Sequence, residues 1–138
     1  MSIVAKEAEI VEEFSMFEDW TAKYEYLIDL GRSLPLIEQN LKTEEHLIKG
    51  CQSQVWLDAG FDGEKVHFRA DSDAQIPKGI VSLLVRVMSD ETPDEIVNTP
   101  LSFIDKIGLK EHLSPTRANG LVSMVNQMKM YALAFQHK

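Results

Sequence analysis

The sequence predicts an α+β fold in which several helices cover a small antiparallel β-sheet. One observation is an Asp-Gly pair, Asp62-Gly63, between two runs of alternating apolar and polar residues, which indicates a β-hairpin over about residues 54–71. The other is that most remaining apolar residues recur at intervals of three or four, as they do along a helix with one buried face. Because neither kind of element can bury its apolar face alone, we expect the helices to pack against one face of the hairpin.

Two helices are predicted before the hairpin. Apolar residues between Ile3 and Phe17 recur at intervals of three, four and seven, with charged residues on the opposite side. A second helix is expected to follow the capping-box spacing of Ser15 and Glu18. Gly31 is expected to end this helix, because glycine readily adopts the backbone conformation found just beyond a helix end.

The hairpin register follows from the turn. If Asp62 and Gly63 are the two turn residues, the remaining pairs are found by counting outward from Phe61 and Glu64. On the apolar face this count gives the pairs Ala59–Val66, Leu57–Phe68 and Val55–Ala70. On the exposed face it gives the pairs Asp58–His67 and Trp56–Arg69. The histidine is therefore expected to face a carboxylate rather than to bind a metal. Residues 46–49 are a candidate third strand beside the hairpin.

Four helices are predicted after the hairpin, each from a capping residue followed by a proline in the first turn. The four openings are Ser72 or Asp73 with Pro77, Thr92-Pro93, Thr99-Pro100 and Ser114-Pro115. The two short helices in the middle are expected to end near Asn98 and Gly108. The first of the four is apolar over a wide arc, which places it at the centre of the core, and the last continues to the C-terminus with one apolar stripe.

The composition fits one globular domain spanning residues 1–138. A net charge of -8 disfavours binding to nucleic acid or to an anionic membrane surface. No apolar run approaches the roughly 20 residues that span a bilayer, and the N-terminus lacks the pattern of a secretory signal. Together with a single free thiol, these features favour a cytoplasmic protein. A monomer and a homodimer are both compatible with the sequence.

Cys51 is the only cysteine in the chain, so it has no partner for an internal disulfide. The preceding Gly50 allows a tight bend, which favours a loop position for the thiol. The residues alone leave two interpretations open. Lys49 and His46 are close enough in sequence to stabilise a reactive thiolate by their positive charge, whereas an isolated cysteine is more often a small buried apolar side chain.

Four segments of the chain carry distinctive motifs. They are Gly50-Cys51-Gln52-Ser53-Gln54-Val55-Trp56, the run Trp-x3-Tyr-x2-Leu-Ile-x-Leu-Gly-x2-Leu-Pro from Trp20 to Pro35, Asp71-Ser72-Asp73-Ala74 with Lys78-Gly79, and His112-Leu113-Ser114-Pro115-Thr116-Arg117 with Gly120-Leu121. In this order, and over nearly the whole chain, they resemble the SufE family of sulfur-acceptor proteins. His46 is a departure, because the family is expected to have a smaller polar residue such as asparagine there.

The resemblance implies sulfur-transfer chemistry at Cys51. A partner cysteine desulfurase, which depends on pyridoxal phosphate, would hold sulfur from L-cysteine as a persulfide, and Cys51 would take that sulfur and pass it to an iron-sulfur cluster scaffold complex. A thiolate attacks the outer sulfur of a persulfide as in disulfide exchange, so no second cysteine is needed. The resemblance therefore implies no resident cofactor, because the pyridoxal phosphate belongs to the partner. A metal site is disfavoured for a separate reason: the chain offers one cysteine and four histidines scattered among different predicted elements.

The resemblance also implies supporting residues around the thiol. Gly50, Gln52 and Ser53 would shape the loop, and Arg117 would support either this loop or the docking surface. Asp73 resembles a family segment near the loop, and capping of the following helix accounts for it equally well. Between encounters we expect the thiol to be held in an apolar pocket, which shields a persulfide from water and oxidants, and to swing outward when the protein docks.

Three other functions are considered beside that of a sulfur acceptor for an iron-sulfur scaffold. A paralogous acceptor that supplies another sulfur-requiring enzyme would have nearly the same sequence. A scaffold that assembles clusters on its own surface is disfavoured, because one cysteine cannot hold a cluster within a single chain. A one-cysteine peroxide-reducing protein would instead form a sulfenic acid at Cys51 when it meets peroxide.

Overall fold

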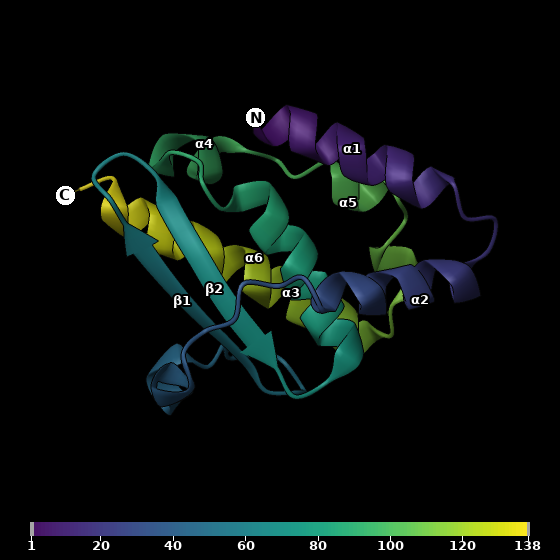
Figure 1. Cartoon of the computed structure of the whole chain (residues 1–138), viewed down its shortest axis with the longest axis horizontal. Coiled ribbons are helices and arrows are strands. Elements are labelled where there is room, and N and C mark those ends of the chain that lie inside the picture. Colours follow the sequence, from purple (N-terminus) through teal and green to yellow (C-terminus); the bar gives the residue numbers. More distant parts are fainter. Residues whose placement is uncertain (1, 138) are drawn as a thin grey trace.

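The computed structural model describes residues 2–137 and has the predicted α+β fold (Figure 1). Within these residues, six α-helices accompany one two-stranded antiparallel sheet. The helices and strands are α1 (Ile3–Ser15), α2 (Trp20–Gly31), β1 (Val55–Phe61), β2 (Val66–Ser72), α3 (Gln75–Met88), α4 (Pro93–Asn98), α5 (Phe103–Lys106) and α6 (Pro115–Phe135). Three short 3-10 turns are η1 (Gln39–Leu41), η2 (Glu44–His46) and η3 (Lys110–His112).

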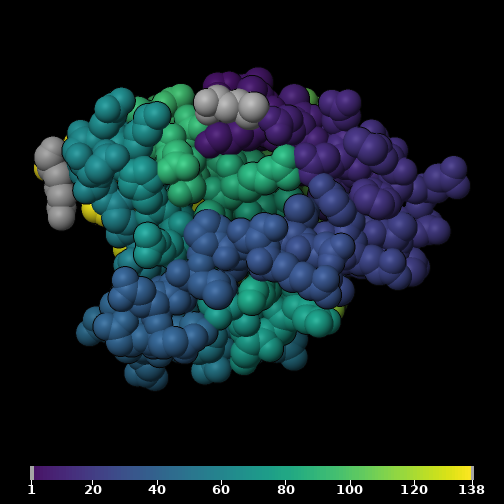
Figure 2. Space-filling view, viewed as in Figure 1, coloured from purple at the N-terminus to yellow at the C-terminus, as the bar shows by residue number. Residues whose placement is uncertain are grey.

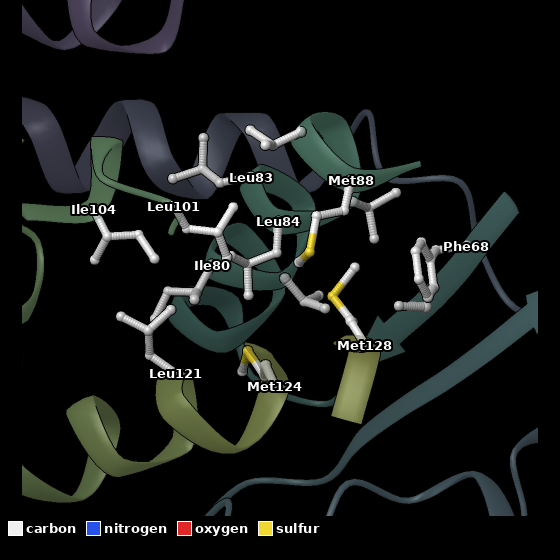
Figure 3. Close-up of a cluster of buried hydrophobic side chains, with 14 of the residues drawn as sticks. Phe68, Ile80, Leu83, Leu84, Met88, Leu101, Ile104, Leu121, Met124 and Met128 are labelled. Atoms are coloured by element: carbon white, nitrogen blue, oxygen red, sulfur yellow. The ribbon is translucent and has the colours of Figure 1, made fainter. Parts of the chain in front are cut away.

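Helix α3 lies at the centre of the molecule, as its wide apolar arc predicts. It packs against α1, α2, α6 and β2. Its buried side chains meet those of α6, β2 and the α5 region in one cluster (Figure 3). The labelled members of this cluster are Phe68, Ile80, Leu83, Leu84, Met88, Leu101, Ile104, Leu121, Met124 and Met128. In Figure 2 the connector that contains η1 and η2, in blue, projects as a lobe at the lower left of this body.

Glycines allow α2 and α3 to approach each other closely. A Cβ atom at Gly79 would overlap the carbonyl oxygen of Leu27, and one at Gly31 would lie 3.3 Å from the backbone nitrogen of Gly79. Gly31 is also the last residue of α2, close to where the sequence predicts its end. The crossing fixes the first turns of α3, and these turns line the thiol site described below.

The start of α2 differs from the predicted capping box. Asp19 is the N-cap, and its Oδ1 accepts a hydrogen bond of 2.8 Å from the backbone nitrogen of Ala22. Ser15 instead belongs to the last turn of α1, where its hydroxyl donates to the carbonyl oxygen of Glu12 at 2.6 Å. The capping-box prediction is wrong because Asp19, directly before the helix, supplies the acceptor.

The hairpin has the predicted faces but a register shifted by two residues. The observed pairs are Val55–Ser72, Trp56–Asp71, Leu57–Ala70, Asp58–Arg69, Ala59–Phe68, Gly60–His67 and Phe61–Val66. The loop contains four residues, because Asp62 Oδ1 accepts hydrogen bonds from the backbone nitrogens of Glu64 at 2.9 Å and Lys65 at 2.7 Å. This side-chain turn replaces the two-residue turn of the prediction. A shift of two keeps every side chain on its face, so the apolar face remains buried.

The predicted pairs on the exposed face are therefore wrong, although His67 does contact carboxylates. Its Nε2 lies 2.8 Å from Asp62 Oδ2, and its Nδ1 lies 2.5 Å from Asp90 Oδ1. The hydrogen bond to Asp62 is the largest cause of a raised pKa at His67; burial opposes it, and the hydrogen bond to Asp90 adds to the rise. Trp56 pairs with Asp71 rather than Arg69.

Residues 46–49 do not form a third strand. Leu47 makes a single antiparallel bridge to Trp56, and the backbone nitrogen of Ile48 donates to the carbonyl oxygen of Val55 at 2.8 Å. The contact ends there because η2 occupies the residues before it and Gly50, with φ of 94°, turns the chain directly after it.

Two of the four predicted openings after the hairpin are confirmed. Thr92 caps α4 and Ser114 caps α6 through side-chain oxygens. α5 begins at Phe103 rather than after Thr99, because Leu101 has φ of 51°, a value that a helix does not contain. Thr99 Oγ1 accepts a hydrogen bond from the Leu101 backbone nitrogen at 3.3 Å instead.

The N-cap of α3 is Ala74, and it makes no side-chain capping bond. The predicted caps, Ser72 and Asp73, have other partners. Ser72 Oγ donates to the carbonyl oxygen of Gln54 at 2.8 Å, and Asp73 Oδ1 accepts from the backbone nitrogen of Gln54 at 3.0 Å. Both side chains therefore hold the segment that leaves the cysteine loop.

Candidate functional site

Cys51 lies in the loop between η2 and β1, and Gly50 gives this loop its bend. Gly50 has φ of 94°, in the left-handed region that favours glycine. A Cβ atom at this position would also overlap the hydroxyl oxygen of Ser123 on α6. Both the backbone conformation and the close contact with α6 therefore require a residue without a side chain, as the sequence predicts for the bend.

The thiol rests against the first half of α6. Cys51 is half-buried, and its Sγ lies 3.6 Å from the carbonyl oxygen of Gly120, within the range of a weak S–H···O contact. A Cβ atom at Gly120 would lie 3.5 Å from the sulfur and 3.8 Å from the Cys51 Cα. Gly120 and Ser123, one turn apart, thus form the surface on which Gly50 and Cys51 sit. We call this surface the α6 seat.

Two hollows meet at Cys51. The inner one has a volume of about 40 Å³ and lies between the loop, α3 and α6. Its lining residues are Cys51, Gln52, Ser53, Pro77, Ile80, Thr116, Arg117, Gly120 and Met124. The outer one, of about 410 Å³, is lined by Glu44 and residues 47–54. Cys51 therefore borders both a small hollow and a larger depression.

Burial raises the pKa of the Cys51 thiol. This direction is opposite to that expected from Lys49 and His46. Both ring nitrogens of His46 contact residues other than Cys51. Its Nε2 lies 3.6 Å from Asp58 Oδ1, and its Nδ1 lies 3.2 Å from Thr43 Oγ1. In this conformation the site protects the neutral thiol rather than stabilising the thiolate.

Both ends of the cysteine loop are fixed by backbone hydrogen bonds. Before the loop, the nitrogen of Ile48 donates to Val55, as described above. After the loop, Gln54 donates to the Asp73 carboxylate, and its carbonyl oxygen accepts from Ser72 Oγ and, at 3.2 Å, from the Asp73 backbone nitrogen. Residues 49–53 are the part of the loop between these two anchors.

The structure brings most of the predicted supporting residues together. Gln52 and Ser53 line both hollows, and Arg117 lines the inner one from the first turn of α6. Arg117 is exposed, and its guanidinium makes no ion pair among the residues described. Asp73 does not touch the inner hollow, and it acts on the loop through Gln54.

Sequence reasoning missed Ser123 and the packing role of Gly120. The available signal is the spacing of two small residues, three positions apart, in a helix whose neighbouring buried positions are large.

Sequence reasoning also missed the ion pairs that Asp71 makes with Lys42 Nζ at 2.5 Å and Lys78 Nζ at 3.2 Å. Burial alone would raise the pKa of Asp71, but the hydrogen bonds from Lys42, the Ser72 backbone and Lys78 outweigh it and lower the pKa. These contacts join the connector to the end of β2 and the start of α3.

The SufE family model, described as an Fe-S metabolism associated domain, matches residues 8–132. The chain belongs to the SufE family. Family membership connects this chain with iron-sulfur metabolism. No helix among the residues described is long and apolar enough to cross a membrane.

Curated SufE-like relatives match most of the chain. It is 37% identical to an uncharacterized SufE-like protein of Rhizobium meliloti (strain 1021), over 90% of this chain and 92% of that protein. It is 40% identical to an uncharacterized SufE-like protein of Synechocystis sp., over 94% of this chain and 81% of that protein. SufE-like protein 1, chloroplastic/mitochondrial, of Arabidopsis thaliana is also 40% identical, over 94% of this chain but 35% of that longer protein.

A solved structure agrees with the fold. The solution structure of a hypothetical protein from Thermus thermophilus matches with a TM-score of 0.80, covering 96% of this chain and 97% of that chain. The sequences are 20% identical, so this likeness concerns the SufE-like fold alone.

The raised pKa of Cys51 predicts slow alkylation at neutral pH. Iodoacetamide reacts with the thiolate, and burial leaves less thiolate in the folded protein than in the unfolded chain. The modification rate of the folded protein should therefore rise through a midpoint at higher pH than that of the same protein in urea, over a range of about pH 6 to 10. Intact mass spectrometry gives both rates. A folded midpoint at or below the unfolded one would contradict the protected seat.

Gly50→Ala is expected to push the loop off the α6 seat, because the new Cβ atom overlaps Ser123. Iodoacetamide should then modify Cys51 several-fold faster at neutral pH, because the exposed thiol is no longer desolvated and more of it is thiolate. Gly63→Ala is the matched control: Gly63 has φ of 96°, nearly the same as Gly50, but no atom near its missing side chain. Equal rates in the two variants would contradict the seat, because the overlap with Ser123 would then have no effect on the reactivity of Cys51.

Proposed function

We propose that this protein is a sulfur acceptor that takes persulfide sulfur from a pyridoxal phosphate-dependent cysteine desulfurase onto Cys51, stimulates that enzyme, and delivers the sulfur to an iron-sulfur cluster scaffold complex in the cytoplasm. The observation that carries the proposal is the position of the lone thiol. It lies half-buried on a loop whose two ends are held by hydrogen bonds, and a small hollow borders Cys51.

The chemistry needs only the thiol of this chain. The Cys51 thiolate attacks the outer sulfur of the desulfurase persulfide, and a new sulfur–sulfur bond forms at Cys51. The original sulfur–sulfur bond of the donor breaks, and its electron pair leaves on the donor cysteine, which takes up the proton that Cys51 has lost. No external oxidant or reductant enters, since one persulfide is replaced by another.

The α6 seat buries the Cys51 thiol, whereas sulfur transfer requires this thiol to be exposed. In the seated position burial raises the thiol pKa, so transfer requires residues 49–53 to move outward and expose the sulfur to the donor. After transfer, the return of the loop carries the terminal sulfur toward the inner hollow. Its volume of about 40 Å³ exceeds the roughly 10–15 Å³ that a cavity needs to hold one water molecule, so the space has room for one added sulfur atom.

Arg117 is the charged group on the rim of the inner hollow. A persulfide is more acidic than a thiol and carries negative charge at neutral pH, so an exposed guanidinium with no ion-pair partner in the described chain is placed to stabilise it or to contact the donor. Asp73 contributes by holding Gln54, the anchor about which the loop moves. Gly50, Gln52 and Ser53 give the moving segment its shape.

The alternatives fit the site less well or differ only in the receiver. A peroxide-reducing cysteine requires a lowered thiol pKa, and here burial raises it. A paralogous acceptor would use the same site and deliver sulfur to another enzyme, so this alternative concerns the partner and not the chemistry of Cys51.

Incubation with a cysteine desulfurase and L-cysteine tests the proposal. Intact mass spectrometry should show a gain of one sulfur atom on the wild-type protein, reversed by a reductant, because the new persulfide is a reducible sulfur–sulfur bond. Cys51→Ser should remain folded and gain nothing. A gain in Cys51→Ser, or no gain in the wild type with the desulfurases of the same cell, would contradict the proposal.

A further inference from the structure

A second groove, separate from Cys51, runs along α1. It has a volume of about 580 Å³ and lies between α1 and the segment from the end of α4 to α5. Its lining residues extend from Ser2 to Ser15, a length of about 20 Å at 1.5 Å per helical residue. No residue that lines this groove lines either hollow at Cys51. In Figure 1, α1 and α5 lie along the upper edge of the molecule, and the start of β1 lies at the lower edge.

Helix α1 presents small and apolar side chains to this groove. Val4, Ala8, Val11 and Ser15 line it at helical spacing, so they follow one face of α1. Val4 is 75% exposed, whereas Ile3, Ile10 and Phe14 of the same helix are buried. The buried ring of Phe103 contributes to the other side. An exposed apolar stripe beside a groove of this length is long enough to contact a helix of about three to four turns.

The charged residues that line the groove indicate the charge of a helix that would bind there. Glu7 lines it and is only 8% exposed, and its Oε2 accepts a hydrogen bond of 3.0 Å from the backbone nitrogen of Phe103. Among the residues described, this carboxylate has no cationic partner. Glu12 and Glu95 also line the groove, against a single basic residue, Lys106. A buried carboxylate without a counter-charge is costly, so a positive group placed in the groove would be stabilised.

We infer that the groove between α1 and α5 binds one amphipathic helix of a protein partner, with its apolar side chains toward Val4 and Val11 and a lysine or arginine near Glu7. The length of the groove favours a helix over a compact ligand. Its acidic lining, in a chain of net charge -8, favours a basic partner over a second copy of this chain. A helix bound here leaves the Cys51 loop free, so the inference does not depend on sulfur transfer.

A library of random peptides of roughly 16 residues, displayed on phage and selected against the full-length protein, tests this inference. An enriched peptide is then synthesised, and its affinity is measured by calorimetry for the wild type, Val4→Lys, Glu7→Gln and Met16→Lys. Met16→Lys is the matched control, because Met16 is 69% exposed near the end of the same helix but does not line the groove. Circular dichroism confirms that each variant is folded.

We expect the enriched peptides to be amphipathic helices with at least one basic residue. Their affinity should fall about tenfold or more in Val4→Lys and in Glu7→Gln, and it should be unchanged in Met16→Lys and in Cys51→Ser. No enrichment, or affinity that is insensitive to both groove variants, overturns the inference. So does sedimentation that shows a wild-type dimer and a monomeric Val4→Lys, because the groove would then hold a second copy of the chain.

Discussion

Two glycines, one on the cysteine loop and one on α6, allow the loop to lie directly against this helix. Gly50 lets the loop approach Ser123 of α6, and Gly120 lets the Cys51 sulfur lie against the backbone of the same helix. The rest of the structure supports this contact. α3 carries Pro77 and Ile80 to the other side of the sulfur, and the crossing with α2 at Gly79 fixes the first turns of α3.

This arrangement separates protection of the sulfur from its reactivity. A thiol on the seat is partly desolvated, and its raised pKa makes it a weak nucleophile at neutral pH. The same burial would keep a loaded sulfur from water and oxidants. An acceptor that met its donor in the seated state would react slowly. The two anchors resolve this conflict, because residues 49–53 can move while Ile48 and Gln54 stay in place.

Local chemistry in the sequence predicted much of the fold. Apolar periodicity identified the helices and both faces of the hairpin. When one face of a strand is buried, its apolar residues fall at every second position. The register was wrong because Asp62 bonds two backbone nitrogens and widens the turn. The predicted N-caps of α2 and α3 were wrong for a related reason. Several polar side chains compete for each helix start, and tertiary contacts such as those of Asp73 with Gln54 decide which one is used.

For the site, the sequence identified Cys51, its glycine and the neighbouring polar residues, because they are contiguous in one motif. It did not reveal Ser123, nor the direction in which the thiol pKa is shifted. Both depend on which helix lies under the loop, a contact between residues about 70 positions apart. Lys49 and His46 are close to Cys51 in sequence, but proximity along the chain did not predict the electrostatic environment of the sulfur.

A crystal structure of the protein persulfidated at Cys51 tests the central claim most directly, because it locates the added sulfur atom. We expect this sulfur to lie in the inner hollow, between Ile80 and Met124, with the loop on the α6 seat. A sulfur atom that instead points into the outer hollow lined by residues 47–54, with the loop still seated, would contradict the claim that the seat shields the transferred sulfur.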